Sequence, residues 1–438
     1  MAESRHILTD RDLLLNELPD VQPLDYNGYV ARGGYLGLER AINDLKPSGV
    51  LEAVLISGLF GRGGAGFSTA KKWQMVLFQP GDTKYLCCNG AEDEPGTFKD
   101  RYLLRSNPHQ LIEGAILAAY AIGANEGYLY INGTFDEEIL FLNKALDEAC
   151  EHGHLERPLE GFKKGISLKI AKTPGTYVSG EETALLEVIE GRPAKPKQKP
   201  PYYPAIHGLF GKPTLVNNLE TICNLPHIVR EGGDFYKKIG HPSGTMIFSL
   251  TGDVRRPGIY ELPLGTPIRV LIENYGGGVV NAGKVKAFFP GGPSIAILPG
   301  DKIDLPLDLS TLKTAGSSLG TGSVIVMSEE SCMVKNALLY AGFFAKESCG
   351  QCPPCYLGLA NITEILRKID AGDGEDGDIQ QLEQLCDMIK GRGYCYLLTG
   401  GVIAVESILL HFKSEFQTHI KASRCPFGSS QTAKSPTF

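Results

Sequence analysis

Apolar and polar positions follow two alternating patterns between residues 83 and 173. Short apolar runs bounded by turn residues predict buried strands over 83–90, 126–132 and 165–173. Longer segments with helical spacing predict helices over 107–125 and 136–153. This alternation of strands and helices indicates a parallel sheet covered by helices.

Other segments predict further elements on both sides of this region. Residues 48–61 predict a helix capped by Ser48. Residues 192–204 contain five prolines and three lysines and predict an extended connector. From about residue 245, short strands and turns predict a small β-rich region with one helix at 267–275. Four further helices, which we expect to form a bundle, are predicted over 331–346, 358–370, 378–391 and 400–416.

The expected domain division follows these changes of pattern. It comprises an N-terminal helical and loop region (1–75), an α/β domain (76–240), a β-rich domain (241–330), a helical domain (331–424) and a disordered tail (425–438).

Composition excludes several classes of protein. The 438 residues are 42% hydrophobic and carry a net charge of −7, which argues against a general nucleic-acid-binding protein. The longest strongly apolar run, 114–124, is too short to span a bilayer, and no signal peptide is visible. We therefore expect a cytoplasmic protein without direct membrane insertion.

The cysteines provide the most specific chemical signal. Eleven cysteines in a chain without a secretion signal argue against a disulfide framework. Cys349, Cys352 and Cys355 form a C-x2-C-x2-C run, which is typical of a [4Fe–4S] cluster. Cys395, in a glycine-flanked loop, is the expected fourth ligand, and Cys386 is the alternative. A structural zinc site is the competing interpretation, although zinc motifs usually present two separated cysteine pairs.

A glycine-rich loop provides the second signal. Gly61, Gly63 and Gly66 satisfy G-x-G-x-x-G, but the preceding residues have helical rather than strand spacing. A following helix, capped by Ser68 or Thr69, would still point backbone N–H groups at a ligand. The loop is therefore interpreted as a nucleotide-binding loop outside the ordinary Rossmann turn, and a plain tight turn is the alternative.

Three further segments carry polar residues next to predicted elements. Residues 88–101 follow a strand and contain four candidates for binding ribose hydroxyls: Asn89, Glu92, Asp93 and Glu94. The other two segments place Glu181 and Glu182, and Asn217, Asn218 and Thr221, at helix starts. The glutamates could instead complement a helix dipole, and one asparagine could simply cap its helix.

These stretches together carry a family resemblance. GRGGAGFSTAKKW, EPGTFKDR, GTYVSGEETALLEVIEGRPA, PTLVNNLET and CGQCPPC closely resemble the family of F-type subunits of NADH-quinone oxidoreductase (respiratory complex I), which bind NADH and carry the flavin. The collinear similarity runs from about residue 30 to 415. The resemblance implies a Rossmann-like flavin-binding α/β domain with a parallel sheet. A ubiquitin-like β-grasp domain of the soluble-ligand-binding type and a four-helix bundle with the iron–sulfur cluster would follow.

The resemblance also implies the chemistry. NADH would give a hydride to FMN, and single electrons would pass to the [4Fe–4S] cluster held by Cys349, Cys352, Cys355 and Cys395. The cofactor carries this reaction, so no catalytic residue is implied, and Glu92, Glu94 and Tyr177 are the nearest candidates. The cofactor-binding residues implied by the motifs are Arg62, Gly63, Gly64, Ala65, Gly66, Phe67, Lys72, Asn89, Glu92, Glu94, Tyr177, Gly180, Glu181, Glu182, Val216, Asn217, Asn218 and Thr221.

The family further implies partners. These are a thioredoxin-like [2Fe–2S] subunit and a larger iron–sulfur subunit, through which the chain would lie at the inner membrane and pass electrons toward quinone. The alternative within the same class is the diaphorase subunit of a soluble NAD-linked hydrogenase or formate dehydrogenase. A single C-x2-C-x2-C run favours the respiratory complex.

The chain departs from the usual family pattern at four positions. Ser68 stands where proline is common, and Tyr356 where arginine is common. Ala91 replaces an aspartate and Asp93 replaces a glycine. The first change affects the expected flavin contact at position 91, and the second affects dinucleotide binding near position 93.

Overall fold

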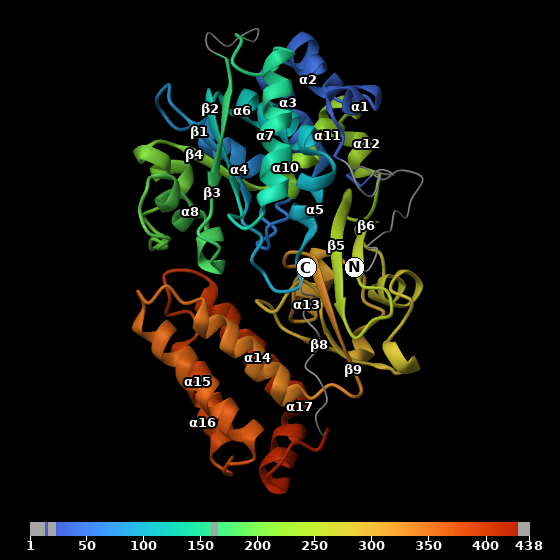
Figure 1. Cartoon of the computed structure of the whole chain (residues 1–438), viewed down its shortest axis with the longest axis vertical. Coiled ribbons are helices and arrows are strands. Elements are labelled where there is room, and N and C mark those ends of the chain that lie inside the picture. Colours follow the sequence, from blue (N-terminus) through green and yellow to red (C-terminus); the bar gives the residue numbers. More distant parts are fainter. Residues whose placement is uncertain (1–13, 16–22, 159–164, 428–438) are drawn as a thin grey trace.

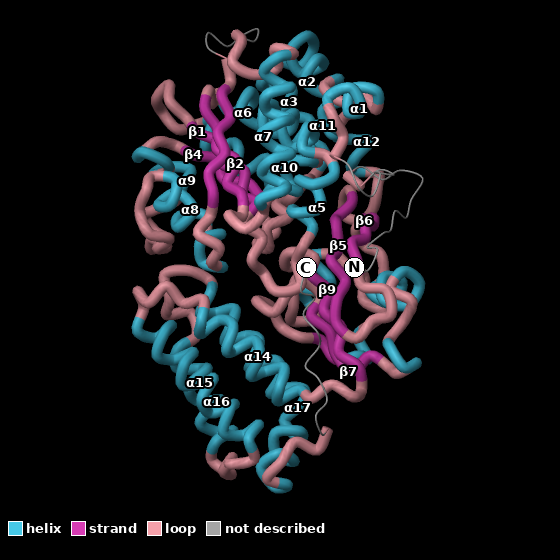
Figure 2. Tube along the Cα trace, viewed as in Figure 1, coloured by secondary structure: helices cyan, strands magenta, loops and turns pink. Residues whose placement is uncertain are grey.

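The computed structural model describes residues 14–15, 23–158 and 165–427, and these form three parts (Figure 1). An α/β part with one sheet, a second part with a separate sheet and a part made of four helices follow one another along the chain (Figure 2). The predicted tail lies outside the described residues from 428 onward, as do residues 1–13 and 16–22 of the predicted N-terminal region.

The first sheet contains four parallel strands in the order β3-β2-β1-β4. Its strands are β1 (Tyr85–Gly90), β2 (Glu126–Ile131), β3 (Ser167–Lys172) and β4 (Thr214–Asn218). The first three match the predicted strands, whereas β4 was not predicted. The strand order reverses beside β1, so β1 and β4 form a topological switch point, where open α/β sheets bind ligands outside the carboxyl ends of their strands.

Twelve helices of the described residues surround this sheet. They are α1 (Tyr26–Ala31), α2 (Leu36–Arg40), α3 (Lys46–Ser57), α4 (Thr69–Leu77), α5 (Lys99–Ser106), α6 (Pro108–Ile122), α7 (Asp136–Glu151), α8 (Glu182–Ile189), α9 (Pro204–His207), α10 (Leu219–Cys223), α11 (Leu225–Glu231) and α12 (Gly233–Lys237). The predicted helices 107–125 and 136–153 correspond to α6 and α7.

Alternation along the strands explains why helices cover both faces. Leu86 and Cys88 of β1 belong to the core that contains α6, all of whose residues are buried. Cys87, between them, faces a separate cluster that includes Leu185 and Leu186 of α8. Successive strand residues point to opposite faces, so one apolar strand packs against both layers.

The cap predicted for the helix near residue 48 is wrong. Helix α3 begins at Lys46, and Ser48 lies within its first turn. Pro47 accounts for the earlier start, because its fixed φ suits the first turn and its missing N–H is not needed there. The predicted absence of a strand before the glycine loop is confirmed, since α3 precedes the loop and α4 follows it.

The second sheet has the strand order β6-β5-β9-β7-β8. Its strands are β5 (Thr245–Gly252), β6 (Gly258–Pro263), β7 (Val285–Phe289), β8 (Leu298–Pro299) and β9 (Ser323–Ser328). Only β5 and β9 pair in parallel. A helical turn over Val270–Tyr275 lies where the sequence predicts one, and a short helix α13 (Leu309–Thr314) also packs in this part.

The third part consists of α14 (Met333–Lys346), α15 (Pro353–Ala371), α16 (Asp378–Ile389) and α17 (Leu397–Ala422). Helix α15 contacts each of the other three, and α17 also contacts α14 (Figure 1). By length and composition α17 could cross a membrane, and it is the one such helix among the described residues. It is interrupted at Phe412, and Val402, Val405 and Ile408 are buried within this part, so packing accounts for its apolar character.

The predicted connector is also present. Residues 192–203 contain no helix or strand. Two of its lysines pair with α8 and its cap: Lys197 with Glu187 at 2.6 Å, and Lys199 with Glu181 at 2.7 Å. These ion pairs hold the connector against the α/β part.

Candidate functional site

The glycine loop closes against the switch point of the first sheet. Its ends are held by a hydrogen bond from the Gly61 N–H to the Phe67 carbonyl, 2.8 Å. A Cβ at Gly63 would lie 3.0 Å from the Asn218 Cβ at the end of β4, and Gly64 has φ +113°. Side chains are therefore excluded where the loop approaches the strand.

The residues that follow the loop have separate roles. Ser68 caps α4 by accepting a hydrogen bond from the Lys71 N–H. Of the two residues predicted as possible caps, Ser68 and Thr69, Ser68 is therefore the one that caps the helix. Phe67 is 48% exposed, which leaves its ring available to a ligand. Ala65 is also exposed, whereas Val216 is buried in the sheet.

Arg62 has a buried side chain that points into the protein. Its Nη2 donates to the Thr245 carbonyl at 2.7 Å, and its guanidinium lies 4.0 Å from the Phe60 ring centre. Its backbone N–H donates to the Thr221 hydroxyl at 2.9 Å. Arg62 and Thr221 thus join the glycine loop to α10, and neither side chain is exposed to solvent.

Three predicted asparagines converge at the carboxyl ends of β1 and β4. Asn89 and Asn218 are paired in the sheet register. Asn89 donates to the Gly180 carbonyl at 2.8 Å, and Asn218 caps α10 through the Glu220 N–H at 3.0 Å. The Asn217 amide oxygen accepts from the Trp73 indole at 2.9 Å. Asn218 is therefore the asparagine that caps a helix, which was the alternative role considered for one of these residues.

A buried charge network lies directly beneath these asparagines. The Lys99 ammonium, 1% exposed, pairs with Asp100 at 2.7 Å and with Glu220 at 2.9 Å. It also donates to the Asn218 amide oxygen at 3.3 Å. Burial alone would lower the pKa of Lys99, but the surrounding carboxylates raise it above its usual value, so the ammonium stays charged.

Glu92 lies two residues after the end of β1 in a strained backbone conformation, with φ +48°. Its carboxylate accepts the backbone N–H groups of Asp100 and Arg101 at 2.6 and 2.7 Å. Burial, followed by repulsion from Asp100, raises the pKa of Glu92 to about 8 against these hydrogen bonds. Strain together with a near-neutral pKa is a combination that occurs at functional sites.

Glu94 connects all three parts of the molecule. Its carboxylate accepts the backbone N–H of Ser294, in the β-rich part, at 3.0 Å and also a hydrogen bond from Tyr177. The Tyr177 ring packs against Phe343 and Phe344 of α14. Burial raises the pKa of Glu94, and burial together with Glu94 raises that of Tyr177.

Asp93, one of the departures from the family pattern, is held beside this group. Its Oδ1 accepts from the Asn132 amide at 2.8 Å, and the same amide donates to the Ala91 carbonyl at 2.7 Å. The other carboxylate oxygen of Asp93 is buried without a partner. Burial raises the pKa of Asp93 to about 6.

Two glutamates at the start of α8 form a second charge cluster. Glu181 caps the helix by accepting from the Thr183 and Ala184 N–H groups, which is a structural role at the helix start like the alternative considered for these glutamates. Glu182 pairs with Lys72 at 2.9 Å and with Lys199 at 3.0 Å. Although burial alone would raise it, these two lysines lower the pKa of Glu182 to about 2.

This pKa predicts a pH-dependent contribution to stability. The carboxylate is stabilised in the folded state, so Glu182→Gln should cost on the order of 2 kcal/mol at pH 7. As the pH falls below about 4.5 toward 2, the wild-type carboxylate becomes protonated and the difference should disappear. Urea unfolding followed by the fluorescence of Trp73, the only tryptophan and fully buried, measures this difference. A difference unchanged between neutral and acidic pH would contradict the assignment.

The four predicted cluster cysteines line one cavity. It is enclosed by Val178, Pro196, Ser348, Cys349, Gln351, Cys352, Cys355, Gly393, Tyr394, Cys395, Leu397 and Leu398. Cys386, the alternative fourth ligand, is fully buried within α16 and is not among these residues. Cys395, and not Cys386, therefore shares the cavity with the three cysteines of the C-x2-C-x2-C run.

Hydrogen-bond donors surround these sulfur atoms. The Tyr394 N–H points at the Cys352 sulfur at 3.4 Å, and the Gln351 amide at the Cys349 sulfur at 3.5 Å. Ser348 lies 3.2 Å from the Cys355 sulfur. Donors to thiolate sulfurs stabilise their negative charge and tune the potential of a cluster.

Comparisons with known proteins cover the regions that contain both sites. Residues 54–227 match the Nuo51 FMN-binding domain, and residues 335–419 match the NADH-ubiquinone oxidoreductase-F iron–sulfur binding region. Residues 247–298 match the SLBB domain. The F 2 subunit of NADH-quinone oxidoreductase from Rhizobium meliloti is 45% identical over 91% of this chain and 95% of its own length.

The chain belongs to the family of NADH-quinone oxidoreductase F subunits. The Escherichia coli F subunit is 40% identical over 92% of this chain and 91% of its own. The family identifies this chain as an oxidoreductase with an FMN-binding domain and a [4Fe–4S] region, as the sequence motifs indicate.

A solved structure supports the fold and addresses the alternative. An NAD+-reducing [NiFe]-hydrogenase in the H2-reduced state matches 95% of this chain with a TM-score of 0.80 and 32% identity. This chain covers 67% of that hydrogenase chain but at least nine tenths of the Rhizobium and Escherichia relatives, which are also more identical in sequence. The diaphorase interpretation is therefore not favoured.

Sequence reasoning missed the residues that hold the site together. Lys99, Asp100 and Glu220 were not singled out, and neither was Lys199 of the connector. The quoted motif EPGTFKDR contains Lys99 and Asp100, but a lysine at a helix start is ordinarily exposed. Only Asp100, directly after Lys99, indicated that the positive charge of this lysine is compensated.

Proposed function

We propose that this chain is the NADH-oxidising subunit of a respiratory NADH-quinone oxidoreductase. When bound, FMN supplies hydride acceptance from NADH, and the [4Fe–4S] cluster supplies one-electron transfer toward quinone. The sites for both groups are proposed to be those described above, with Cys349, Cys352, Cys355 and Cys395 as the cluster ligands.

One observation carries this proposal: a single segment borders both sites. Residues 173–199 contribute Tyr177, Gly180 and Glu182 to the expected flavin and dinucleotide site. Val178 and Pro196 of the same segment line the cysteine cavity. The Gln351 amide next to two of the cysteines donates to the Pro196 carbonyl at 3.1 Å. Adjacent sites are what electron transfer from flavin to cluster requires.

The residues at the sheet edge suit an FMN molecule. The glycine loop leaves open space at Gly64, where a Cβ would have no neighbour closer than 3.7 Å. Asp93 has a buried, unpartnered carboxylate oxygen that is suited to accept a hydrogen bond from a hydroxyl of a ribityl or ribose group. Phe67 is exposed and can stack on a flat ring.

The side chains around these groups have distinct proposed roles. Glu92, with a pKa of about 8, and the Tyr177–Glu94 pair can hold a proton near the flavin. Lys72 and Lys199 keep Glu182 ionised at the mouth of the site. The remaining implied residues (Arg62, Gly63, Ala65, Gly66, Asn89, Gly180, Glu181, Val216, Asn217, Asn218 and Thr221) would position backbone and amide groups around the cofactor.

The finer description of the fold belongs to the same proposal. We assign the β-rich part, 241–330, to a ubiquitin-like β-grasp domain, and residues 331–424 to a four-helix bundle. The SLBB match and the mutual packing of α14–α17 support these assignments. The division between 1–75 and 76–240 rests on the glycine loop preceding the first strand.

The partners follow from the proposed electron path. The subunit names of the relatives indicate a multi-subunit complex. We propose that electrons leave this chain for a thioredoxin-like [2Fe–2S] subunit and a larger iron–sulfur subunit, and that these partners hold the chain at the cytoplasmic face of the inner membrane.

An anaerobic NADH titration of the purified complex tests the function. We expect the flavin absorbance to bleach and a reduced-cluster EPR signal to appear as NADH is added. A preparation that contains flavin and iron but shows neither change with NADH would overturn the proposal.

The glycine loop provides a specific test of the flavin site. Gly64→Ala places a side chain at φ +113° and should cost about 1–3 kcal/mol of local strain and reduce FMN retention. Gly81→Ala is the matched control, since Gly81 has φ +100° and open space but lies outside the loop. Equal FMN content in the two variants, measured after gel filtration, would contradict the role of the loop.

A further inference from the structure

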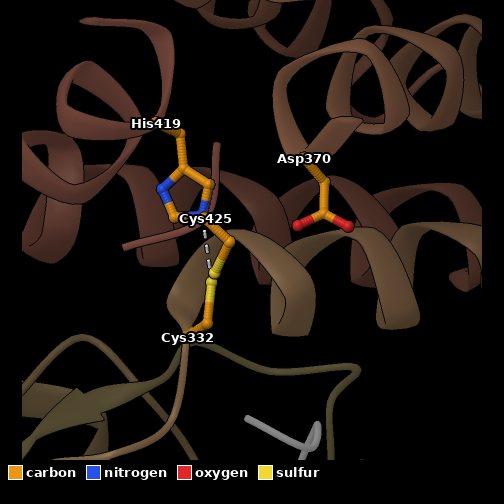
Figure 3. Close-up of side chains that lie close together, drawn as sticks. All are labelled: Cys332, Asp370, His419 and Cys425. Atoms are coloured by element: carbon orange, nitrogen blue, oxygen red, sulfur yellow. Dashed lines mark hydrogen bonds between the residues drawn. The ribbon is translucent and has the colours of Figure 1, made fainter. Parts of the chain in front are cut away.

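A second group of metal-ligating side chains lies away from the cluster cavity (Figure 3). Cys332, Asp370, His419 and Cys425 place their ligand atoms within 4.8 Å of one another. Cys332 caps α14, whereas the cluster cysteines begin after the other end of this 14-residue helix. At 1.5 Å per residue the two sites are about 20 Å apart, so this group belongs to neither proposed redox centre.

The four residues come from separate segments of the helical part. Asp370 is in the last turn of α15, His419 is near the end of α17, and Cys425 follows α17. Cys332 and His419 are 1% and 0% exposed, respectively. Both cysteines are free thiols, and their sulfur atoms are hydrogen-bonded to each other. Folding therefore brings two sulfurs, one imidazole and one carboxylate together at a point where Cys332 and His419 are buried and Asp370 and Cys425 are half-buried.

The orientation of His419 is suited to metal binding. Its Nδ1 lies 2.8 Å from the Glu415 carbonyl, which can only accept, so Nδ1 carries the proton. The lone pair is then on Nε2, which faces the Cys332 sulfur at 3.3 Å. Metal-binding histidines commonly have this arrangement, in which a second hydrogen bond fixes the ring.

Glu415 is itself held in place. Its carboxylate pairs with Lys286 at 2.6 Å and accepts the Met333 N–H, next to Cys332, at 3.1 Å. The segment that orients His419 is thus tied to the segment that carries Cys332. The ligands are supported by a second layer of contacts.

Asp370 supplies an independent observation. Its Oδ1 is buried without a hydrogen-bond partner. A buried carboxylate oxygen without a partner is costly, and a cation within reach of the neighbouring thiols would satisfy it.

We propose that Cys332, Asp370, His419 and Cys425 bind a zinc ion. Two thiolates, one imidazole nitrogen and one carboxylate oxygen complete a four-coordinate zinc site. Tetrahedral zinc separates a sulfur and a nitrogen ligand by about 3.5 Å, close to the 3.3 Å between Cys332 and His419. Each thiol loses its proton to solvent and forms a bond to zinc, with no change of oxidation state. The ion fastens the segment after α17 to the start of α14 and the end of α15.

Metal analysis of the purified full-length protein in its complex tests the proposal. We expect about one zinc per chain in addition to the cluster iron. Cys425→Ala and His419→Gln should each reduce the zinc content at least tenfold and leave iron and FMN unchanged. Cys150→Ala, a half-buried free cysteine of α7, is the matched control and should retain zinc. Zinc K-edge absorption should give two sulfur neighbours at about 2.3 Å.

Three results would overturn the site. The first is protein without zinc even after incubation with zinc sulfate. The second is zinc that persists in Cys425→Ala and His419→Gln but is lost in Cys395→Ser, which would place it in the cluster cavity. The third is a Cys332–Cys425 disulfide found by mass spectrometry in protein alkylated under native conditions.

Discussion

Replacing Cys395 with serine is expected to remove the iron–sulfur cluster and leave the flavin in place. Cys395 is the cysteine outside the C-x2-C-x2-C run that lines the common cavity. Loss of a ligand should lower cluster occupancy by at least about tenfold, since even changes behind the ligands cost that much. The four iron atoms of this cluster and its EPR signal after anaerobic NADH should be lost, whereas NADH should still bleach the flavin.

Cys386→Ser is the matched control for this experiment. Cys386 is fully buried in α16, so serine there costs about 1 kcal/mol of stability and spares the cluster. The assignment of the fourth ligand fails if Cys395→Ser keeps its iron or if Cys386→Ser loses it. Misfolding of Cys395→Ser would remove flavin as well as iron. Loss of the cluster alone would leave flavin that NADH still bleaches, so this bleaching distinguishes cluster loss from misfolding.

The elements with long, regular patterns could be predicted from sequence. Helices α6 and α7 and strands β1, β2 and β3 appear within a few residues of their predicted bounds, because buried segments of this length leave few alternatives. The grouping of Cys349, Cys352, Cys355 and Cys395 around one cavity could also be predicted, from the spacing of the first three and the loop context of the fourth.

Strand β4 could not be recognised in the same way. Its five residues, Thr214–Asn218, end in two asparagines directly before α10, so their polar character suggested ligand contacts or a helix cap rather than a strand. Strand β4 is stabilised by pairing with β1, which is more than 120 residues away. Tertiary pairing of this kind overrides local propensity.

The charge network around Lys99 could not be predicted from the sequence for a related reason. Lys99 is separated from Glu220 by more than 100 residues, and a lone lysine in sequence is expected on the surface. The Lys72–Glu182–Lys199 cluster likewise joins three distant segments. Sequence motifs indicated residues that are expected to face the ligands, whereas Lys99, Glu220 and Lys199, which hold those segments in place, became visible only in the folded chain.

Lys99→Met is expected to destabilise the α/β part by about 3–5 kcal/mol and to reduce FMN retention. The substitution leaves Asp100 and Glu220 as buried carboxylates without their cation, which costs far more than the ion pair itself contributes. Asn218, which accepts from Lys99 and stands beside the glycine loop, would lose a contact as well. Urea unfolding followed by Trp73 fluorescence reports on this region, because Trp73 is hydrogen-bonded to the neighbouring Asn217.

Lys169→Met is the matched control, because Lys169 forms an equally short ion pair with Glu126, 2.7 Å, but is 54% exposed. An exposed pair contributes at most about 1 kcal/mol, so this variant should remain close to wild type. If Lys99→Met is too unstable to purify, Lys99→Arg keeps the charge and should show an intermediate loss, since a guanidinium does not fit the same three partners. Similar losses for Lys99→Met and Lys169→Met would mean that burial does not set the strength of the network. The large difference expected here follows from a single physical contrast: water can solvate Glu126 after its lysine is removed, but it cannot reach Glu220, which is 0% exposed.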